Sequence, residues 1–137
     1  MKLIPINPEN INLAWKDIEG FVESGLKYCD DKYNIEDIYE LIISEQLILW
    51  VVYNDDKGKA IGCLLTQVLD YPQVRSLSIF LAAGINLEQI MMAYDDLINY
   101  AKAVGCRKIE LYGRHGWERV LSKLDFVKTH TVMRLNL

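Results

Sequence analysis

The sequence has few residues that could cross-link the chain or hold a metal ion: three cysteines and two histidines among 137 residues. Cys29, Cys63 and Cys106 stand far apart, without a C-x-x-C pair or a Cys/His cluster. Neither a disulfide framework nor a structural zinc site is expected from this spacing. Cys63 falls in an apolar segment and is predicted to be a small core residue. Unpaired cysteines of this kind are typical of a reducing compartment, so we expect a cytoplasmic protein.

Long apolar runs and an excess of positive charge are also missing. The apolar runs, such as residues 47–52 (LILWVV), fall far short of the roughly 20 residues that span a bilayer. Residues 1–10 lack the apolar core and small-residue cleavage site of a signal peptide. The net charge of −4 disfavours a surface built for nucleic-acid phosphates. Neither a membrane nor a nucleic acid is therefore expected as a partner.

Hydrophobic residues, in contrast, make up 51% of the chain, which is enough for one domain with a substantial core. No internal repeat or linker divides the sequence, so residues 1–137 are predicted to form a single domain.

In the first half of the sequence, the spacing of hydrophobic residues changes from strand-like to helical and back to strand-like. Residues 2–6 alternate like a strand, and apolar residues then recur at helical spacing between Ile11 and Leu26. Asn34 is placed to cap a second helix. Three β-rich runs follow, separated by short turns, at residues 47–53, 60–69 and 74–82. They are predicted to form an antiparallel meander.

The second half predicts a helix-strand-helix-strand ending. Residues 86–106 carry one apolar face and are predicted to form one long helix, and residues 108–113 a strand parallel to residues 74–82. A short helix with Leu121 on its apolar face then leads to a closing strand at 126–137. The predicted class is α+β (an α/β three-layer arrangement), with a mostly antiparallel mixed sheet and one parallel β-α-β crossover, in the order β-α-α-β-β-β-α-β-α-β.

This order of elements, with residues 78–91 (SIFLAAGINLEQIM) and 121–126 (LSKLDF), resembles the GCN5-related N-acetyltransferase family. In that family a strand leads into a phosphate-binding loop and a long helix, and a later short helix ends in a motif of the form Y-x-K-L-G-F. The resemblance implies a GNAT-like domain that transfers an acetyl group from acetyl-CoA to an amine by direct attack. The acceptor would be a small molecule or a peptide.

The family's phosphate-binding loop has the form R/Q-x-x-G-x-G/A and lies at a helix N-terminus, where free N–H groups face an anion. Here no Arg, Lys or Gln stands nearer to Gly84 than Arg75, so an ordinary strand-to-helix turn explains this segment equally well. The cofactor-binding residues implied by the resemblance are Leu81, Ala82, Ala83, Gly84, Ile85 and Asn86, with Arg114 near a phosphate or the pantetheine arm.

The family commonly protonates the leaving thiolate with a tyrosine, at the position that Leu121 occupies here. Tyr112 is the candidate to replace that acid, and Glu110, on the same face of its strand, is the candidate for a base acting through water. The alternative for both residues is structural: a packed tyrosine and an exposed surface charge.

Two functions therefore stay open: an N-acetyltransferase, or a degenerate member of the fold that serves as a binding or structural module. Residues 113–121 (GRHGWERVL) are similar to the endings of small phage-encoded members, which would fit a virus-associated protein. Residues after Phe126 suffice for one strand of the usual length or for a very tight pair, where the family has two strands that wall the acceptor site. The wall would come from the first two helices or from a partner chain in a homodimer. A gap between strands 74–82 and 108–113 would favour the enzyme, because it admits the pantetheine arm.

Overall fold

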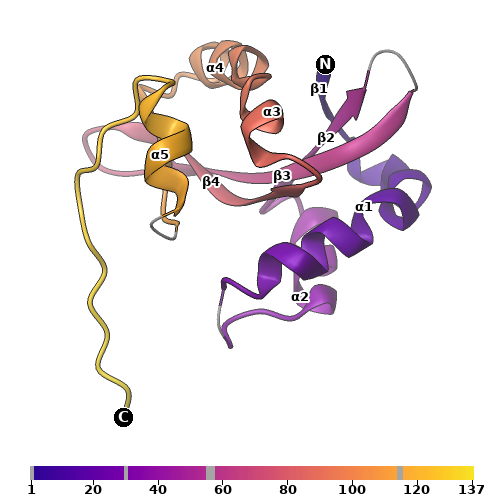
Figure 1. Ribbon diagram of the computed structural model, residues 1–137, viewed down its shortest axis with the longest axis horizontal. Helices are drawn as coiled ribbons and strands as arrows, with labels where there is room; N and C mark the ends of the chain where they lie inside the picture. The colour runs from indigo at the N-terminus through magenta and orange to yellow at the C-terminus, as the bar shows by residue number, and fades with distance from the viewer. Residues whose placement is uncertain (1, 30, 55–57, 114–115) are drawn as a thin grey trace.

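The computed structural model describes residues 2–29, 31–54, 58–113 and 116–137. A central sheet separates two groups of helices: α1 and α2 cover one face, and α3, α4 and α5 cover the other (Figure 1). The elements are β1 (Lys2–Pro5), the short 3-10 helix η1 (Pro8–Asn10), α1 (Ile11–Leu26), α2 (Ile35–Ile43), β2 (Ile48–Asn54), β3 (Lys59–Asp70), β4 (Arg75–Gly84), α3 (Leu87–Met91), α4 (Tyr94–Ala103), β5 (Lys108–Leu111) and α5 (Gly116–Ser122).

The sheet has five strands in the order β1-β2-β3-β4-β5. Strands β1 to β4 pair antiparallel with their neighbours, whereas β4 and β5 pair in parallel across the helices α3 and α4. The antiparallel meander, the parallel crossover and the α+β class predicted from the sequence are thereby confirmed.

Short polar segments set the starts of the N-terminal helices. The Asn7 side chain accepts a 3.1 Å hydrogen bond from the Glu9 amide at the start of η1. At α2, Asn34 accepts from the Asp37 amide at 2.8 Å, and the Asp37 carboxylate accepts from the Asn34 amide at 3.0 Å. This reciprocal pair satisfies two donors that a helix start otherwise leaves open. Asn34 caps α2 as the sequence predicts.

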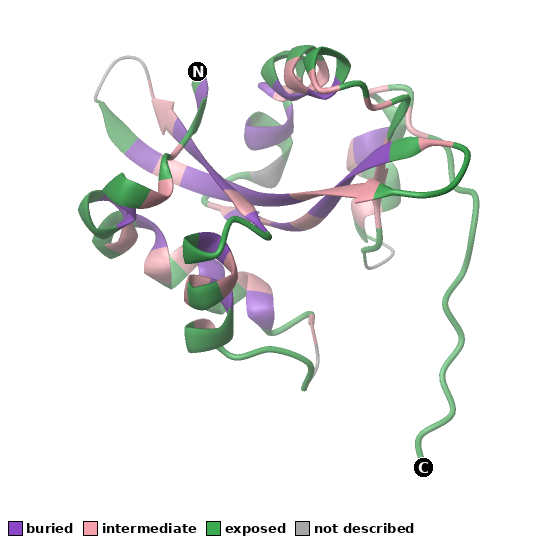
Figure 2. Cartoon of the chain, turned by 180° about the vertical axis from the view of Figure 1, so that it is seen from behind, coloured by how far each residue is buried: buried purple, intermediate pink, exposed green. Residues whose placement is uncertain are grey.

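The core consists of two hydrophobic clusters, one on each face of the sheet (Figure 2). Cys63 lies in the cluster under α1 and α2, where burial raises the pKa of its thiol to about 12. Its predicted role as a small core residue is thus confirmed. On the other face, the Trp50 indole donates a 2.9 Å hydrogen bond to the hydroxyl of the fully buried Thr66, which satisfies both polar groups.

The prediction of one long helix over residues 86–106 is wrong, because the segment forms two helices, α3 and α4. Their junction at Met92 and Ala93 tightens into i→i+3 hydrogen bonds, among them one from the Ala93 amide to the Ile90 carbonyl at 3.1 Å. The two helices pack on different strands: α3 on β3 and β4, and α4 on β1 and β5. The Asp96 carboxylate anchors α4 by accepting from the Leu3 amide at 3.2 Å. Since the strands of a sheet are twisted relative to one another, a single straight helix follows both regions poorly.

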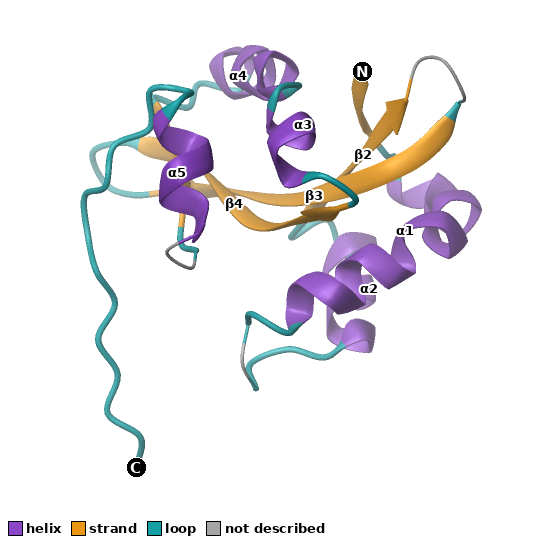
Figure 3. Cartoon of the chain, viewed as in Figure 1, coloured by secondary structure: helices purple, strands orange, loops and turns teal. Residues whose placement is uncertain are grey.

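The predicted closing strand at 126–137 is also wrong. Residues 127–137 belong to no helix or strand and run as an extended, exposed segment (Figure 3). The pattern of the segment is β-like, but a strand needs a neighbour to satisfy its backbone groups, and none of the described strands lies beside it.

None of the helices in the described residues is both long and apolar enough to span a bilayer.

Candidate functional site

Strands β4 and β5 stop pairing in the middle of β4. The parallel ladder runs from Ser76 opposite Lys108 to Ile79 opposite Leu111, and β4 then continues to Gly84 without β5 beside it. On its other edge, β4 shifts register against β3 at the same point, leaving Phe80 as an extra residue. A bulge of this kind bends a strand and increases its twist. β5 is paired with β4 along its whole length and ends at Leu111, so the predicted gap between these two strands stays a prediction.

The aromatic ring of Tyr33, in the connection between α1 and α2, packs edge-on against Phe80 with ring centroids 5.0 Å apart. This contact brings the first helical pair over the bulged part of β4. The face of the sheet on this side of the bulge is thus bordered by the α1–α2 connection.

The predicted cofactor-binding residues on β4 have mainly structural side chains. Leu81 and Ala83 are buried in the cluster under α1 and α2, and Ala82 packs into the cluster on the opposite face. A Cβ on Gly25 of α1 would lie only 2.9 Å from Leu81 side-chain atoms. The side chains of these residues pack in the core, so only their backbone N–H and C=O groups can contact a ligand.

Gly84 is required by the packing of α3. A Cβ at this position would collide with the Ile90 side chain and would lie 2.6 Å from the carbonyl oxygen of Ile61. Gly62, the antiparallel partner of Gly84, is restricted by the same Ile90 side chain. Because neither glycine carries a side chain, Ile90 packs directly on the backbone of the sheet here. This packing accounts for a glycine at position 84 without any contact to a phosphate.

The start of α3 borders a shallow pocket of about 390 Å³. The Asn86 side chain accepts a 3.1 Å hydrogen bond from the Gln89 amide, as expected for a cap, so one of the first-turn N–H groups is already engaged. Ile85 is 71% exposed beside it. The pocket is lined by Asn54, Ile61, Ile85, Asn86 and Gln89. A lining of amides and apolar groups at a helix start can bind a ligand through backbone and amide donors.

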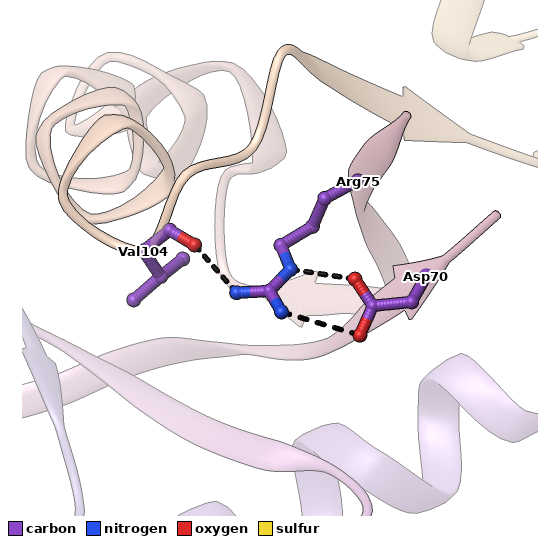
Figure 4. Close-up of polar contacts among 3 residues, drawn as sticks. All are labelled: Asp70, Arg75 and Val104. Atoms are coloured by element: carbon purple, nitrogen blue, oxygen red, sulfur yellow. Dashed lines mark hydrogen bonds and ion pairs between the residues drawn. The ribbon is translucent and has the colours of Figure 1, made fainter. Parts of the chain in front are cut away.

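Arg75 is not available as the basic residue of a phosphate loop. Its guanidinium makes two hydrogen bonds to the Asp70 carboxylate, at 2.6 and 3.3 Å, and a third to the Val104 carbonyl at 2.8 Å (Figure 4). The hydrogen bonds to Asp70 and the charge of its carboxylate raise the pKa of Arg75. Together with the bond to Val104 they tie the β3–β4 turn to the end of α4. Arg114, the other predicted basic contact, lies outside the described residues.

Sequence reasoning missed the cation that does lie at the start of α3. Lys123, just after α5, makes a 2.7 Å ion pair with Glu88 in the first turn of α3. The hydrogen bond from Lys123 lowers the pKa of Glu88, with a smaller contribution from the charge of Arg119. Arg119 and Lys123 are spaced i and i+4, which is the signal that places both side chains on one side of a helical segment.

Glu110 and Tyr112, the predicted catalytic pair, are brought together. Ile109 and Leu111 pack into the cluster under α3, α4 and α5, so Glu110 between them points to the opposite face. Its half-buried carboxylate accepts a 3.0 Å hydrogen bond from the Ser76 hydroxyl. Tyr112 is 63% exposed. The negative charge of Glu110 is the main cause that raises the pKa of Tyr112, ahead of burial and of Tyr71.

The two parts of the predicted site are far apart along β4. Glu110 pairs with Ser78, and Gly84 lies six positions further along the strand, a separation of about 20 Å at the usual rise of a strand. A ligand that contacts both Glu110 and the start of α3 must therefore be long and narrow.

The position of the family's tyrosine is occupied by a core residue. Leu121 is 6% exposed and packs in the cluster under α3, α4 and α5. Four residues later, Asp125 has φ of 66° in the position where the family motif has glycine, the left-handed conformation that usually ends a helix. The left-handed turn at Asp125 suits a position where the motif has glycine, whereas Leu121 supplies no phenol.

No protein-family model matches the sequence, and no curated protein matches it. Solved structures of acetyltransferases match it over nearly the whole chain. A probable acetyltransferase has a TM-score of 0.74 at 8% identity, over 100% of this chain and 97% of that one. The ribosomal-protein-alanine N-acetyltransferase of Brucella melitensis biovar Abortus 2308 has a TM-score of 0.70 at 10% identity, with 100% of both chains covered. A predicted acetyltransferase of Clostridium acetobutylicum, solved with acetyl-CoA, has a TM-score of 0.66 at 16% identity over 98% and 95%.

These neighbours have the GCN5-related N-acetyltransferase fold, and the present chain has this fold too. At such identities the likeness establishes the architecture alone.

Proposed function

We propose that the protein is an acetyl-CoA-dependent N-acetyltransferase acting on a small-molecule or peptide amine. The observation that carries the proposal is the end of the β4–β5 ladder at Ile79, after which β4 continues to Gly84 beyond the end of β5, with Glu110 and Tyr112 near the end of the ladder and the start of α3 beyond the far end of β4. This arrangement suits a long, narrow acyl carrier. The match to an acetyltransferase solved with acetyl-CoA supports the choice of carrier.

In this proposal the β4 backbone from Phe80 to Gly84, whose edge toward β5 has no partner among the described strands, holds the pantetheine arm. The start of α3, with Asn86, holds the phosphates. Acetyl-CoA would supply a thioester carbonyl that the acceptor amine attacks directly. The chain's own residues then manage two protons: Glu110 takes one from the amine through a water molecule, and Tyr112 gives one to the leaving thiolate.

The coupling between Glu110 and Tyr112 suits this order of events. An ionised Glu110 keeps the pKa of Tyr112 raised, so the phenol stays protonated before the reaction. When Glu110 takes the proton of the amine, its charge disappears and the phenol becomes a stronger acid. Tyr112 is then most able to donate when the thiolate leaves.

A binding or structural module is the second candidate, and specific observations favour it. Gly84 is explained by packing against Ile90, Arg75 is committed to Asp70, and Leu121 fills the core. The cytoplasmic location and the viral association expected from the sequence stay predictions under either candidate.

Calorimetric titration with acetyl-CoA separates the two candidates. The enzyme requires a saturable binding signal, followed by release of free CoA when an amine is added. The absence of binding at millimolar acetyl-CoA would rule out the transferase and leave the module.

Two charge insertions on either side of α3 test the location of the carrier. Ile85→Glu places a carboxylate beside the helix start and is expected to abolish binding of the anionic carrier. Met92→Glu places the same charge at the far end of α3 and should leave binding unchanged. Ile85 and Met92 are 71% and 66% exposed, so neither variant disturbs the core. Equal losses in both variants would contradict this location.

A further inference from the structure

Residues 127–137 form an exposed apolar segment. The whole segment is exposed, and its large apolar side chains have exposed fractions of 72% to 116%. These side chains are Val127, Val132, Met133, Leu135 and Leu137. Five exposed large apolar side chains within eleven residues are uncommon on a monomeric soluble protein, and such exposure marks a surface that another molecule covers.

The segment has the pattern of a half-buried strand. Its odd positions carry apolar or β-branched residues: Val127, Thr129, Thr131, Met133, Leu135 and Leu137. Its even positions are mainly polar: Lys128, His130, Val132, Arg134 and Asn136. Alternation with a period of two places the first set on one face and the second on the other when the chain is extended. The segment is therefore suited to join a sheet.

The edge of β5 offers the matching surface. In the described sheet β5 is the last strand and pairs with β4 alone, and an open edge is a template for a strand from another chain. Ile109 and Leu111 lie on the face covered by α5, where the apolar face of an added strand would extend the core. Glu110 lies on the opposite face, where the basic side chains of the segment would meet its charge.

We propose that residues 127–137 of one chain pair with β5 of a second copy, and that the exchange is reciprocal. The chain's own geometry favours a second copy over the same chain. Lys128 is held to Glu118 of α5 by a 3.1 Å ion pair, and beyond it the segment runs away from the body (Figure 1). Reciprocal pairing gives a closed two-fold dimer that covers both apolar segments and both open edges.

The exchanged strand would also lie beside Glu110 and Tyr112. It would form a wall there that the described sheet of one chain lacks. This consequence rests on the proposed transferase, whereas the pairing itself does not.

Light scattering coupled to size exclusion tests the dimer with variants of matched charge on the two faces of the segment. The wild-type protein is expected to elute as a dimer. Met133→Arg, on the apolar face, should convert it to a monomer, and Asn136→Arg, on the polar face, should leave the dimer intact. Both positions are exposed in the single chain, so the fold of the body, checked by circular dichroism, is expected to stay the same. A wild-type monomer at all concentrations, or equal effects of the two variants, would overturn the proposal.

Hydrogen exchange distinguishes pairing between chains from pairing within one chain. The amides of residues 127–137 are expected to be protected at high protein concentration and to lose protection on dilution, together with those of β5. Protection that does not depend on concentration would show folding onto the same chain and would also overturn the proposal. Because neither measurement uses acetyl-CoA, failure of the dimer and failure of the transferase can be told apart.

Discussion

The side chain of Ile90 in α3 lies directly over Gly84 at the end of β4, in a space that leaves no room for a Cβ on the glycine. The position that the family resemblance assigns to the phosphate loop is thus the contact between a helix and the sheet. Both uses of a glycine require close approach of a second group to the backbone. In a phosphate loop the approaching group is a ligand, whereas at Gly84 it is the Ile90 side chain.

Gly84→Ala is expected to lower the free energy of unfolding by about 1–3 kcal/mol, the usual cost of overfilling a packed site. Chemical denaturation measures the change. Shortening the helix side chain with Ile90→Val should rescue the variant only in part, because the Ile61 carbonyl would still lie 2.6 Å from the new Cβ.

Gly20→Ala is the matched control for this prediction. Gly20 lies in α1 with no atom within 4 Å of an added Cβ, so the substitution should raise stability by about 0.5–1 kcal/mol through the helix preference of alanine. A loss of stability in both variants would indicate that the contact with Ile90 is not the cause.

The end of α5 gives a second prediction. Asp125 has φ of 66°, and the amide of Phe126 after it donates to the Leu121 carbonyl at 3.2 Å. Glycine adopts this conformation without strain, and alanine does not. Asp125→Gly should therefore be more stable than Asp125→Ala by about 1 kcal/mol, with the wild-type protein between them. Thermal unfolding of the three proteins measures the order, and a more stable alanine variant would contradict the assignment of the turn.

Much of the fold follows from local signals in the sequence. The Asn34–Asp37 cap, the three β-rich runs and the crossover to β5 are set by residues close in the chain, so the pattern predicts them. The break at Ala93 has no such local signal, because the apolar face runs through it without interruption. It arises from where α3 and α4 pack on the sheet. The final strand fails for a similar reason: its pattern is strand-like, but pairing depends on a neighbour that the pattern does not contain.

In the candidate site, too, some features follow from spacing in the sequence and others are visible only in the folded chain. Glu110 in β5 and Tyr112 just after its end are neighbours because they stand two positions apart in the chain, and sequence spacing captures that relation. The ion pair of Lys123 with Glu88 joins positions 35 residues apart and can be found only in the folded chain. The sequence likewise shows that a glycine stands at position 84, but the group that approaches it is visible only in three dimensions.

The Glu88–Lys123 pair gives a prediction about pH. Because Lys123 lowers the pKa of Glu88 in the folded state, the pair stabilises the fold above the pKa of the unfolded glutamate, and this contribution is lost as the pH falls through the folded pKa. Lys123→Met should raise the pKa of Glu88, as followed by NMR titration of its carboxylate. Lys128→Met removes a cation that pairs with Glu118 instead and should leave Glu88 unchanged. If both variants raised the pKa of Glu88 equally, the cause would be the overall charge of the protein and not the ion pair with Lys123.

The phenol of Tyr112 provides the sharpest test of the predicted catalytic pair. Since the charge of Glu110 is the main cause of its raised pKa, Glu110→Gln should lower the pKa of Tyr112 toward that of an ordinary tyrosine. Ultraviolet titration measures this, with Tyr112→Phe identifying the signal of this one tyrosine. Ser76→Ala removes the hydrogen bond to Glu110 without removing the charge, so Tyr112 should keep its raised pKa there. If Glu110→Gln leaves the titration of Tyr112 unchanged, the carboxylate and the phenol are not coupled, and the two-proton mechanism loses its physical basis.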